Sequence, residues 1–440
     1  MMVRQSRQRV AIIGSGISGA SAAWALNPLH DVTLFESANH PGGHTATVDI
    51  DYDGTAISVD TGFIVYNELN YPNLTALFKH LGVKTHDSEM SFALSLDNGK
   101  LEWSGQSYGA LFAQKRNLIS PAFLWMLREV LRFNKQCLID RDLGHLQSRS
   151  IGDYLAWRGF SARFRDDYLM PMGAAIWSTP RAKMLDFPAE SFVTFFENHR
   201  LINTDRPVWR TVTGGSRNYL EKLIAPLGNR LRLGTPVSAV KRDRDGALLS
   251  FSNGKTERFD TIIFAGHSDQ TLKILSDPSD DERQILSAIT YRPNRVILHR
   301  DASLMPKRRA AWAAWNYLRS SKPGGEPEIA MTYWMNRLQG IDENKLLFVT
   351  LNPDREPEKG SVFGEWSYDH PQFDAAAMAA QQRLPAIQGR QNSLFAGAWT
   401  GFGFHEDGLR SGLQAAQALG AVIPWHVASK PAIQLAEAAE

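Results

Sequence analysis

The sequence predicts an α/β fold that opens with a parallel strand–helix–strand unit. Three observations predict it. An apolar strand begins at Val10, a glycine turn follows at residues 14–19 (GSGISG), and a second apolar strand ends in Glu36. The acid stands about 20 residues beyond the turn, where a ribose-binding carboxylate belongs in dinucleotide-binding units. We therefore predict a dinucleotide site at this turn, the alternative being a purely structural turn.

Each glycine of the turn has a physical role. Gly14 permits the tight turn, Gly16 lets backbone amides approach a pyrophosphate, and Gly19 allows close packing of helix and strand. The pyrophosphate would lie at the positive end of a helix predicted for residues 17–26. An acid at position 36 favours a free 2′-hydroxyl, and hence FAD or NAD over NADP. The predicted cofactor-binding residues of this unit are Gly14, Ser15, Gly16, Ile17, Ser18, Gly19, Glu36 and Ser37.

Composition and charge exclude several classes of protein. The 440 residues include 48 Lys plus Arg and 46 Asp plus Glu, and a net charge of +2 implies no nucleic-acid partner. The single cysteine, Cys137, excludes an intrachain disulfide and a cysteine-based metal cluster, and it is consistent with a reducing cytoplasm. No metal site is predicted. No apolar run reaches the roughly 18 residues of a membrane-spanning helix.

Four later segments extend the pattern of strands that end in small residues. The glycine pair 42–43 follows Pro41 at a point where the chain turns back, although a simple Pro-Gly turn is the alternative. The segment DTGF (residues 60–63) closes a predicted strand, and IIFAG (residues 262–266) is an apolar strand that ends in small residues. Residues 393–412 read as a strand, a glycine-rich turn and a helix beginning near Gly408. Such a helix N-terminus stabilises negative charge.

Taken together, these segments resemble the flavin-containing amine oxidase superfamily, which includes phytoene desaturase-like and protoporphyrinogen oxidase-like enzymes. The matching residues are GSGISG with Glu36, PGGHT, DTGF, TVTGGS, IIFAG and AGAWTGFGFHEDGLRSG. The resemblance implies noncovalent FAD and a GR2-type FAD-binding Rossmann-like domain beside a discontinuous α+β substrate domain with a mixed sheet and helices. Residues 1–67, 205–275 and 390–425 would form the FAD domain, residues 68–204 and 276–389 the substrate domain, and residues 426–440 a tail.

The resemblance also implies further cofactor contacts, with two departures. The superfamily usually has arginine where this chain has His44, and a carboxylate where it has Ala398. The implied FAD-binding residues are Gly42, Gly43, His44, Thr45, Thr61, Gly62, Phe63, Val237, Ala265, Gly397, Ala398, Glu406, Asp407, Gly408 and Leu409. The segments PMGAAIWSTP and WNYL look like a bacterial group of predicted NAD/FAD-binding proteins associated with cyclopropane-fatty-acid-synthase-like enzymes.

Two histidines are candidate catalytic residues. His299 alternates with apolar neighbours on a predicted strand, where a structural histidine is the alternative to a base. His405 precedes the helix expected to approach the flavin. Dense aromatic residues between positions 177 and 334 belong mostly to the core, but a few lining a cleft would make the pocket long and apolar.

These observations favour a FAD-dependent oxidoreductase that acts on an apolar substrate, by oxidation, desaturation or double-bond shift of a fatty acyl or lipid chain. The alternatives are an amine oxidase that releases hydrogen peroxide, and a non-catalytic FAD protein that serves a lipid-modifying enzyme partner. We expect a cytoplasmic protein, either free or in peripheral contact with the inner membrane. That contact would use residues 108–136, an amphipathic segment with cationic flanks, whose alternative is a helix packed on its own core.

Overall fold

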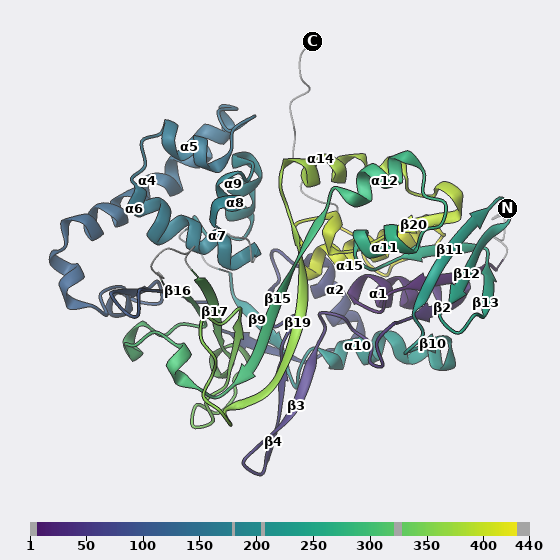
Figure 1. Cartoon of the computed structure of the whole chain (residues 1–440), viewed down its shortest axis with the longest axis horizontal. Coiled ribbons are helices and arrows are strands. Elements are labelled where there is room, and N and C mark those ends of the chain that lie inside the picture. The colour runs from purple at the N-terminus through teal and green to yellow at the C-terminus, as the bar shows by residue number, and fades with distance from the viewer. Residues whose placement is uncertain (1–6, 178–180, 204–206, 321–327, 429–440) are drawn as a thin grey trace.

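The computed structural model describes residues 7–177, 181–203, 207–320 and 328–428. Figure 1 shows an α/β part that contains the N-terminal strands and a second part built from a mixed sheet and a helical layer. Residues 1–6, residues 178–180 of the PMGAAIWSTP segment and residues 429–440 of the predicted tail lie outside the described residues. Within the described residues, no helix is both long and apolar enough to cross a bilayer.

A five-stranded parallel sheet organises the first part. Its strand order is β10-β2-β1-β14-β20, formed by Leu231–Arg232, Asp31–Phe35, Arg9–Ile13, Thr261–Phe264 and Ser393–Phe395. The helix α1 spans Ile17–Leu26 between β1 and β2, so the predicted strand–helix–strand unit is confirmed. The C-terminal helix α15, His405–Ala418, lies against α1.

Close backbone approaches hold α1 in place. A Cβ at Gly19 would lie 1.9 Å from the carbonyl oxygen of Gly14, and a Cβ at Gly412 would lie 2.1 Å from that of Ser18. Neither position has room for a side chain, because atoms at these separations overlap. Gly19 therefore packs helix on strand, as predicted, and Gly412 does the same for α1 on α15.

Several further elements cover the parallel sheet. They are the antiparallel strands β11 (Val237–Asp243), β12 (Gly246–Phe251) and β13 (Thr256–Phe259), and the helices α2 (Pro72–Leu81), α10 (Arg217–Ile224), α11 (Ser268–Ile274), α12 (Asp280–Ser287) and α14 (Ala375–Arg383). Leu77 of α2 packs in one core with Val10 of β1, and Ile285 of α12 packs in another with Phe35 of β2. Thus α2, α12 and α14 contribute to the cores of the first part, although the predicted division assigns their residues to the substrate domain.

The second part is built on a seven-stranded mixed sheet. Its order is β19-β15-β18-β17-β16-β7-β8, formed by Val362–Gln372, Thr290–His299, Phe348–Leu351, Glu328–Trp334, Trp315–Ser320, Phe92–Leu96 and Leu101–Ser104. The pair β16–β7 is parallel and the other pairs are antiparallel. The predicted combination of a mixed sheet with helices is confirmed.

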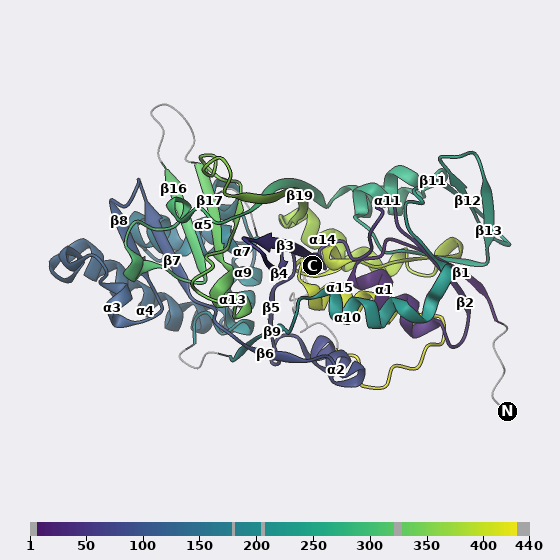
Figure 2. The ribbon, with the colours of Figure 1, turned by 90° about the horizontal axis from the view of Figure 1, so that it is seen from below.

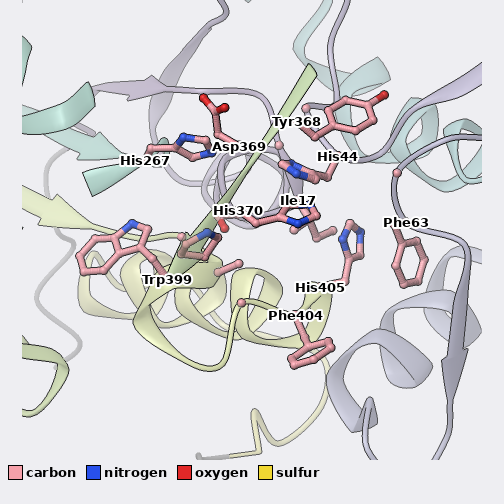
Figure 3. A pocket seen from close by; sticks show the side chains of 18 of the residues that line it. Ile17, His44, Phe63, His267, Tyr368, Asp369, His370, Trp399, Phe404 and His405 are labelled. Carbon is pink, nitrogen blue, oxygen red and sulfur yellow. The ribbon is translucent and has the colours of Figure 1, made fainter. Parts of the chain in front are cut away.

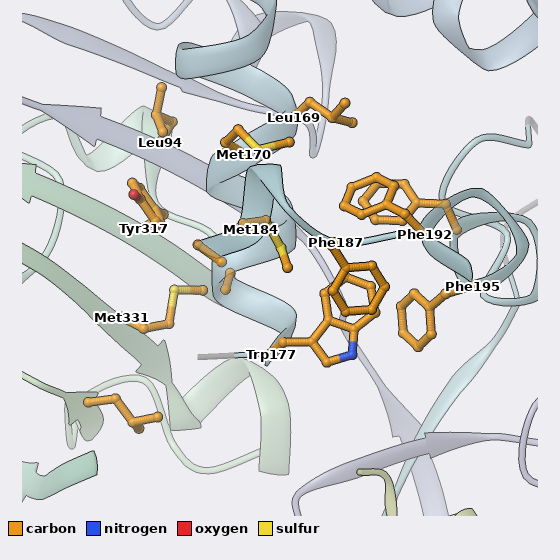
Figure 4. Packing of buried hydrophobic residues seen from close by; sticks show 14 of the residues in the cluster. Leu94, Leu169, Met170, Trp177, Met184, Phe187, Phe192, Phe195, Tyr317 and Met331 are labelled. Carbon is orange, nitrogen blue, oxygen red and sulfur yellow. The ribbon is translucent and has the colours of Figure 1, made fainter. Parts of the chain in front are cut away.

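A helical layer packs on this sheet. It consists of α3 (Tyr108–Leu111), α4 (Pro121–Asp142), α5 (Ile151–Trp157), α6 (Ala162–Phe164), α7 (Met170–Trp177), α8 (Arg181–Leu185) and α9 (Ala189–Asn198), with α13 (Met335–Gln339) following β17. Figure 4 shows Trp177, Phe187 and Phe192 stacked between the helices, with Tyr317 and Met331 contributed by the sheet. As predicted, these aromatic residues are mostly core.

The long strands β15 and β19 run from one part to the other (Figure 1). Two small sheets complete the described strands. One is β3–β4 (Thr47–Tyr52 and Thr55–Asp60), and the other is β5-β9-β6 (Val65–Asn67, Trp209–Val212 and Thr85–Ser88). The last described residues are packed, because Val427 is buried and the Ala428 amide donates to Asn73 Oδ1 of α2 at 3.1 Å. The predicted tail therefore begins as part of the fold.

Candidate functional site

A cavity of about 580 Å³ extends from the glycine turn to the mixed sheet. Figure 3 shows side chains from segments far apart in sequence converging on it, among them His44, Tyr368 and His405. The predicted residues that line it are Gly14, Ser15, Gly16, Ile17, Ser18, Glu36, Ser37, Gly42, Gly43, His44, Thr61, Gly62, Phe63, Val237, Ala265, Gly397, Ala398 and His405. The fold thus brings most of the predicted cofactor residues to one place.

The glycine turn has the shape of an anion site. Gly14 has φ +102°, and a Cβ there would lie 2.9 Å from the Ala265 carbonyl oxygen, so only glycine fits. Gly16 stands at the N-cap of α1, and no side chain caps that helix end. A Cβ at Gly16 would approach only the Gly42 carbonyl oxygen, at 3.9 Å, because the position faces open space. The first-turn amides of α1 are therefore available to a phosphate.

Two polar side chains fix the turn. Glu36 accepts hydrogen bonds from the Ser15 amide at 3.0 Å and from the Ser15 hydroxyl at 2.6 Å. The same hydroxyl oxygen accepts from the Gly42 amide at 3.0 Å. Ser15 therefore ties the glycine turn to the end of β2 and to the 42–43 loop. A carboxylate held there suits a ribose hydroxyl donor, and the uncapped amides suit a pyrophosphate, so the residues present fit a dinucleotide.

Five histidines line the cavity: His44, His199, His267, His370 and His405. Burial lowers the pKa of His44 and of His405 to about 3, and the pKa of His199 and of His370 to about 4. These imidazoles are therefore neutral at pH 7. Among the described lining residues there is no lysine or arginine. The negative charge of a bound pyrophosphate would accordingly be stabilised by backbone amides and the α1 dipole. This arrangement needs no arginine at position 44, where the superfamily usually has one.

Stability should fall when the pH is lowered through the range from 6.5 to about 4. A histidine whose folded pKa lies below 6.5 binds a proton only in the unfolded chain, so acid favours unfolding by up to about 1.4 kcal/mol per pH unit and histidine. Burial raises the pKa of Asp60 to about 6 and of Glu406 to about 7, which acts in the opposite sense. The measurement is therefore the difference in urea-unfolding free energy between pH 7 and pH 5 for wild type and for His44→Asn. The variant should lose less stability in acid, and equal losses would contradict the prediction.

His405 is positioned by aromatic stacking and a hydrogen-bonded chain. It begins α15, and its ring stacks on Phe63 with centroids 3.9 Å apart. Its Nε2 contacts the Tyr219 hydroxyl, which lies 2.6 Å from the Thr45 hydroxyl. Thr45 therefore reaches the site through Tyr219 and does not line the cavity itself. The helix starts three residues earlier than Gly408, where the sequence predicted it.

His299 corrects a prediction. It is fully buried on β15 and does not line the cavity. Its Nε2 lies 2.7 Å from the Thr350 hydroxyl, and its Nδ1 accepts a hydrogen bond from the Asp301 amide at 3.1 Å. Both ring nitrogens have partners, one on β18 and one in the turn that follows β15, so we replace the catalytic interpretation with the structural one.

Five predicted cofactor residues lie behind the cavity. Glu406 accepts hydrogen bonds from the amides of Asn73 and Leu74 at the start of α2. Asp407 pairs with Arg410 at 2.6 Å and accepts from the Phe402 amide. Besides Thr45, those absent from the lining are Gly19, Glu406, Asp407, Gly408 and Leu409, with Leu409 buried in the core and Gly408 packed on Ile17. Neither acid stands in for the carboxylate that Ala398 replaces, because each is engaged in holding the backbone.

Sequence reasoning missed the contribution of β19 and of the turn after β14. Tyr368, Asp369 and His370 at the end of β19 lie beside His44, with the His44 and His370 rings 5.4 Å apart (Figure 3). His267 stacks on Tyr291 at 4.3 Å. No local motif marks these residues. The one available signal was the small-residue end of β14 at Ala265, which His267 follows by two positions.

Comparison with known proteins gives the family. The model for flavin-containing amine oxidoreductases matches residues 17–420, nearly the whole chain. The chain belongs to this family. FAD is therefore its cofactor, and the protein is a FAD-dependent oxidoreductase. The glycine turn, Glu36 and the uncapped α1 described above fit that cofactor.

Several solved structures share the fold at low sequence identity. A fatty acid isomerase from P. acnes that produces CLA superposes with a TM-score of 0.65 at 15% identity, over 95% of this chain and 99% of that one. Putrescine oxidase bound to putrescine gives a TM-score of 0.64 at 17% identity, over 94% and 99%. Cyclohexylamine oxidase from Brevibacterium oxydans gives 0.65 at 17%, over 94% and 98%. At these identities the likeness establishes the fold and leaves the substrate open.

Proposed function

We propose that this FAD-dependent oxidoreductase acts on a lipid, by oxidation, desaturation or double-bond shift of a fatty acyl chain. The observation that carries the proposal is the lining of the cavity where it meets the mixed sheet. The side chains there are apolar or aromatic: Met90, Ile176, Leu201, Trp209, Val296, Trp315, Tyr333 and Leu351. A methylene chain buried against them gains about 25 cal/mol per Å² removed from water.

The small number of charged side chains in the cavity lining favours an uncharged acyl chain as substrate. The carboxylates among the described lining residues are Glu36, which is bonded to Ser15 at the glycine turn, and Asp369, which lies beside His267 (Figure 3). An alkylammonium ion in the apolar end would be buried without an acid, at a cost of several kcal/mol. A free fatty acid would be buried without a lysine or arginine, as far as the described lining extends. Both arguments favour an esterified or amide-linked acyl chain.

Different residues of the chain would bind the cofactor, exclude water and position His405. Bound FAD would supply the acceptor for a hydride or an electron pair from a C–H bond. The first-turn amides of α1 and the Glu36 carboxylate hold and orient the dinucleotide, and the apolar side chains exclude water from the reacting carbon. The Tyr219 hydroxyl lies between the Thr45 hydroxyl and His405 Nε2 and orients the His405 ring at the cavity.

The test is an anaerobic titration followed by product analysis. FAD-loaded protein is mixed with unsaturated phosphatidylcholine vesicles, methyl oleate, sodium oleate, putrescine or cyclohexylamine, and the flavin absorbance is followed before and after air is admitted. We expect bleaching or a shifted double bond, detected by mass spectrometry of the acyl chain, with the esterified lipids alone. Bleaching and hydrogen peroxide with the amines alone would instead assign an amine oxidase, and no change with any lipid would overturn the proposal. A FAD-free Gly16→Val sample controls for lipid autoxidation.

A lipid-modifying enzyme partner would be recognised in the same assay. If electrons from the flavin serve such a partner, acyl conversion requires both proteins, and the flavin alone shows no change with lipid. This interpretation is an alternative to the proposal, and conversion by the purified protein without any partner would exclude it.

A further inference from the structure

The helix α4 lies at the end of the molecule opposite the parallel sheet (Figure 2), and it exposes an apolar stripe. Its outer residues Leu124, Trp125 and Leu131 are 43%, 51% and 73% exposed, and Ile119, just before the helix, is 83% exposed. We call the surface formed by Leu118, Ile119, Leu124, Trp125, Arg128, Leu131 and Lys135 the α4 face. Large apolar side chains gathered on one surface mark an interaction site more often than scattered ones do.

Helical geometry separates this face from the core. At 3.6 residues per turn, positions 124, 128, 131 and 135 fall on one side of α4. The opposite side carries Phe123, Met126, Phe133 and Cys137, which are all fully buried in the main cluster of the second part. The sequence left packing and surface contact as alternatives for this segment, and the structure shows a packed inner side together with an apolar outer side.

The exposed charged side chains on and beside the α4 face are all positive. Lys115, Arg116, Arg128, Arg132 and Lys135 are exposed. The one acid between positions 103 and 139 is Glu129, which is 2% exposed and accepts the Ser161 amide at 2.8 Å. The Arg128 guanidinium lies 5.1 Å from the Trp125 ring, so a cation and an aromatic ring are presented together. The face therefore combines exposed apolar side chains with cations that no surface acid on the segment offsets.

We propose that the α4 face docks on an anionic lipid bilayer. Its apolar stripe would enter the acyl boundary while Arg128 and Lys135 contact lipid phosphates, as in amphipathic helices that lie in the membrane interface. The docking does not require that lipid be the substrate. The α4 face is nevertheless linked to the cavity, because α4 packs against α9, whose Phe195 lines the cavity.

The experiment measures vesicle binding by the FAD-loaded full chain. Sedimentation is carried out with phosphatidylcholine vesicles and with vesicles that also contain phosphatidylglycerol, at low and high salt. We expect at least about tenfold stronger partitioning onto the anionic vesicles, reduced by salt. Ile119→Ser with Leu131→Ser, and Arg128→Glu with Lys135→Glu, should each lower that partitioning about tenfold or more. Trp125 fluorescence should be quenched by brominated lipid, and the quenching should diminish in Trp125→Phe.

Matched variants on the other part of the molecule give the controls. Val422→Ser removes an exposed apolar side chain, and Lys255→Glu with Lys273→Glu reverses two exposed charges away from α4. These variants should bind vesicles like wild type, and every variant should retain the flavin spectrum and melting temperature. Equal binding by control and α4-face variants, or no binding to anionic vesicles, would overturn the proposal. Concentration-dependent dimerisation lost in the Ile119→Ser, Leu131→Ser variant, without vesicle binding, would instead assign the face to a second copy of the chain.

Discussion

Replacing Gly16 with valine should abolish FAD binding and leave the fold intact. The backbone at Gly16 has φ −61° and ψ 179°, a conformation open to valine, and a Cβ would have no neighbour closer than 3.9 Å. The side chain would instead project into the cavity in front of the first-turn amides of α1. Loss of two charge-assisted hydrogen bonds at about 1.5–3 kcal/mol each weakens binding on the order of a hundredfold or more.

The measurement is the ratio of flavin to protein after reconstitution, with the melting temperature of the FAD-free protein beside it. Gly19→Ala supplies the contrast, because its Cβ would lie 1.9 Å from the Gly14 carbonyl oxygen and must disturb the packing of α1 itself. Gly16→Val should therefore lose FAD alone, whereas Gly19→Ala should lose FAD and stability together. Stoichiometric, tightly held FAD in Gly16→Val would refute the assignment of the turn.

Replacing Arg242 with methionine should cost about 3–5 kcal/mol of unfolding free energy. Arg242 of β11 has a side chain that is 0% exposed, and it donates to the two carboxylate oxygens of Glu282 at 2.6 and 2.8 Å and to Asp277 at 3.1 Å. Glu282 is itself only 2% exposed in α12. Methionine fills the volume but leaves this carboxylate buried without its partner, and that desolvated charge is the source of the large effect.

Urea unfolding at pH 7 gives the value, and two further variants interpret it. Arg242→Met combined with Glu282→Met removes both charges and should recover part of the loss, since no isolated charge remains. Arg383→Ala breaks an exposed pair with Asp281 and should change stability by less than about 1 kcal/mol. An Arg242→Met effect no larger than that of Arg383→Ala would show that the buried pair does not secure α12 to β11.

The predictions that held rest on short-range chemistry. The bounds of α1, the strands before and after it, and the position of Glu36 directly after β2 follow from about 25 consecutive residues whose glycines and apolar positions admit one local arrangement. The 42–43 glycine pair and the end of β14 at Ala265 also reach the cavity, because the carboxyl ends of parallel strands meet at one edge of a sheet.

What only the tertiary structure decided lies where side chains far apart in sequence compete for partners. His299 and His405 were both predicted as catalytic candidates, yet Thr350 engages one inside a sheet while the fold turns the other to the cavity. Glu406 and Asp407 belong to the segment that resembles the superfamily's FAD-binding motif. Their carboxylates nevertheless accept hydrogen bonds from backbone amides of α2 and of the 402–404 turn. The sequence by itself determined the dinucleotide cradle, because a turn and a helix end are local. The identity of the other residues that line the cavity, those of β19 above all, depended on long-range strand pairing that no local pattern encodes.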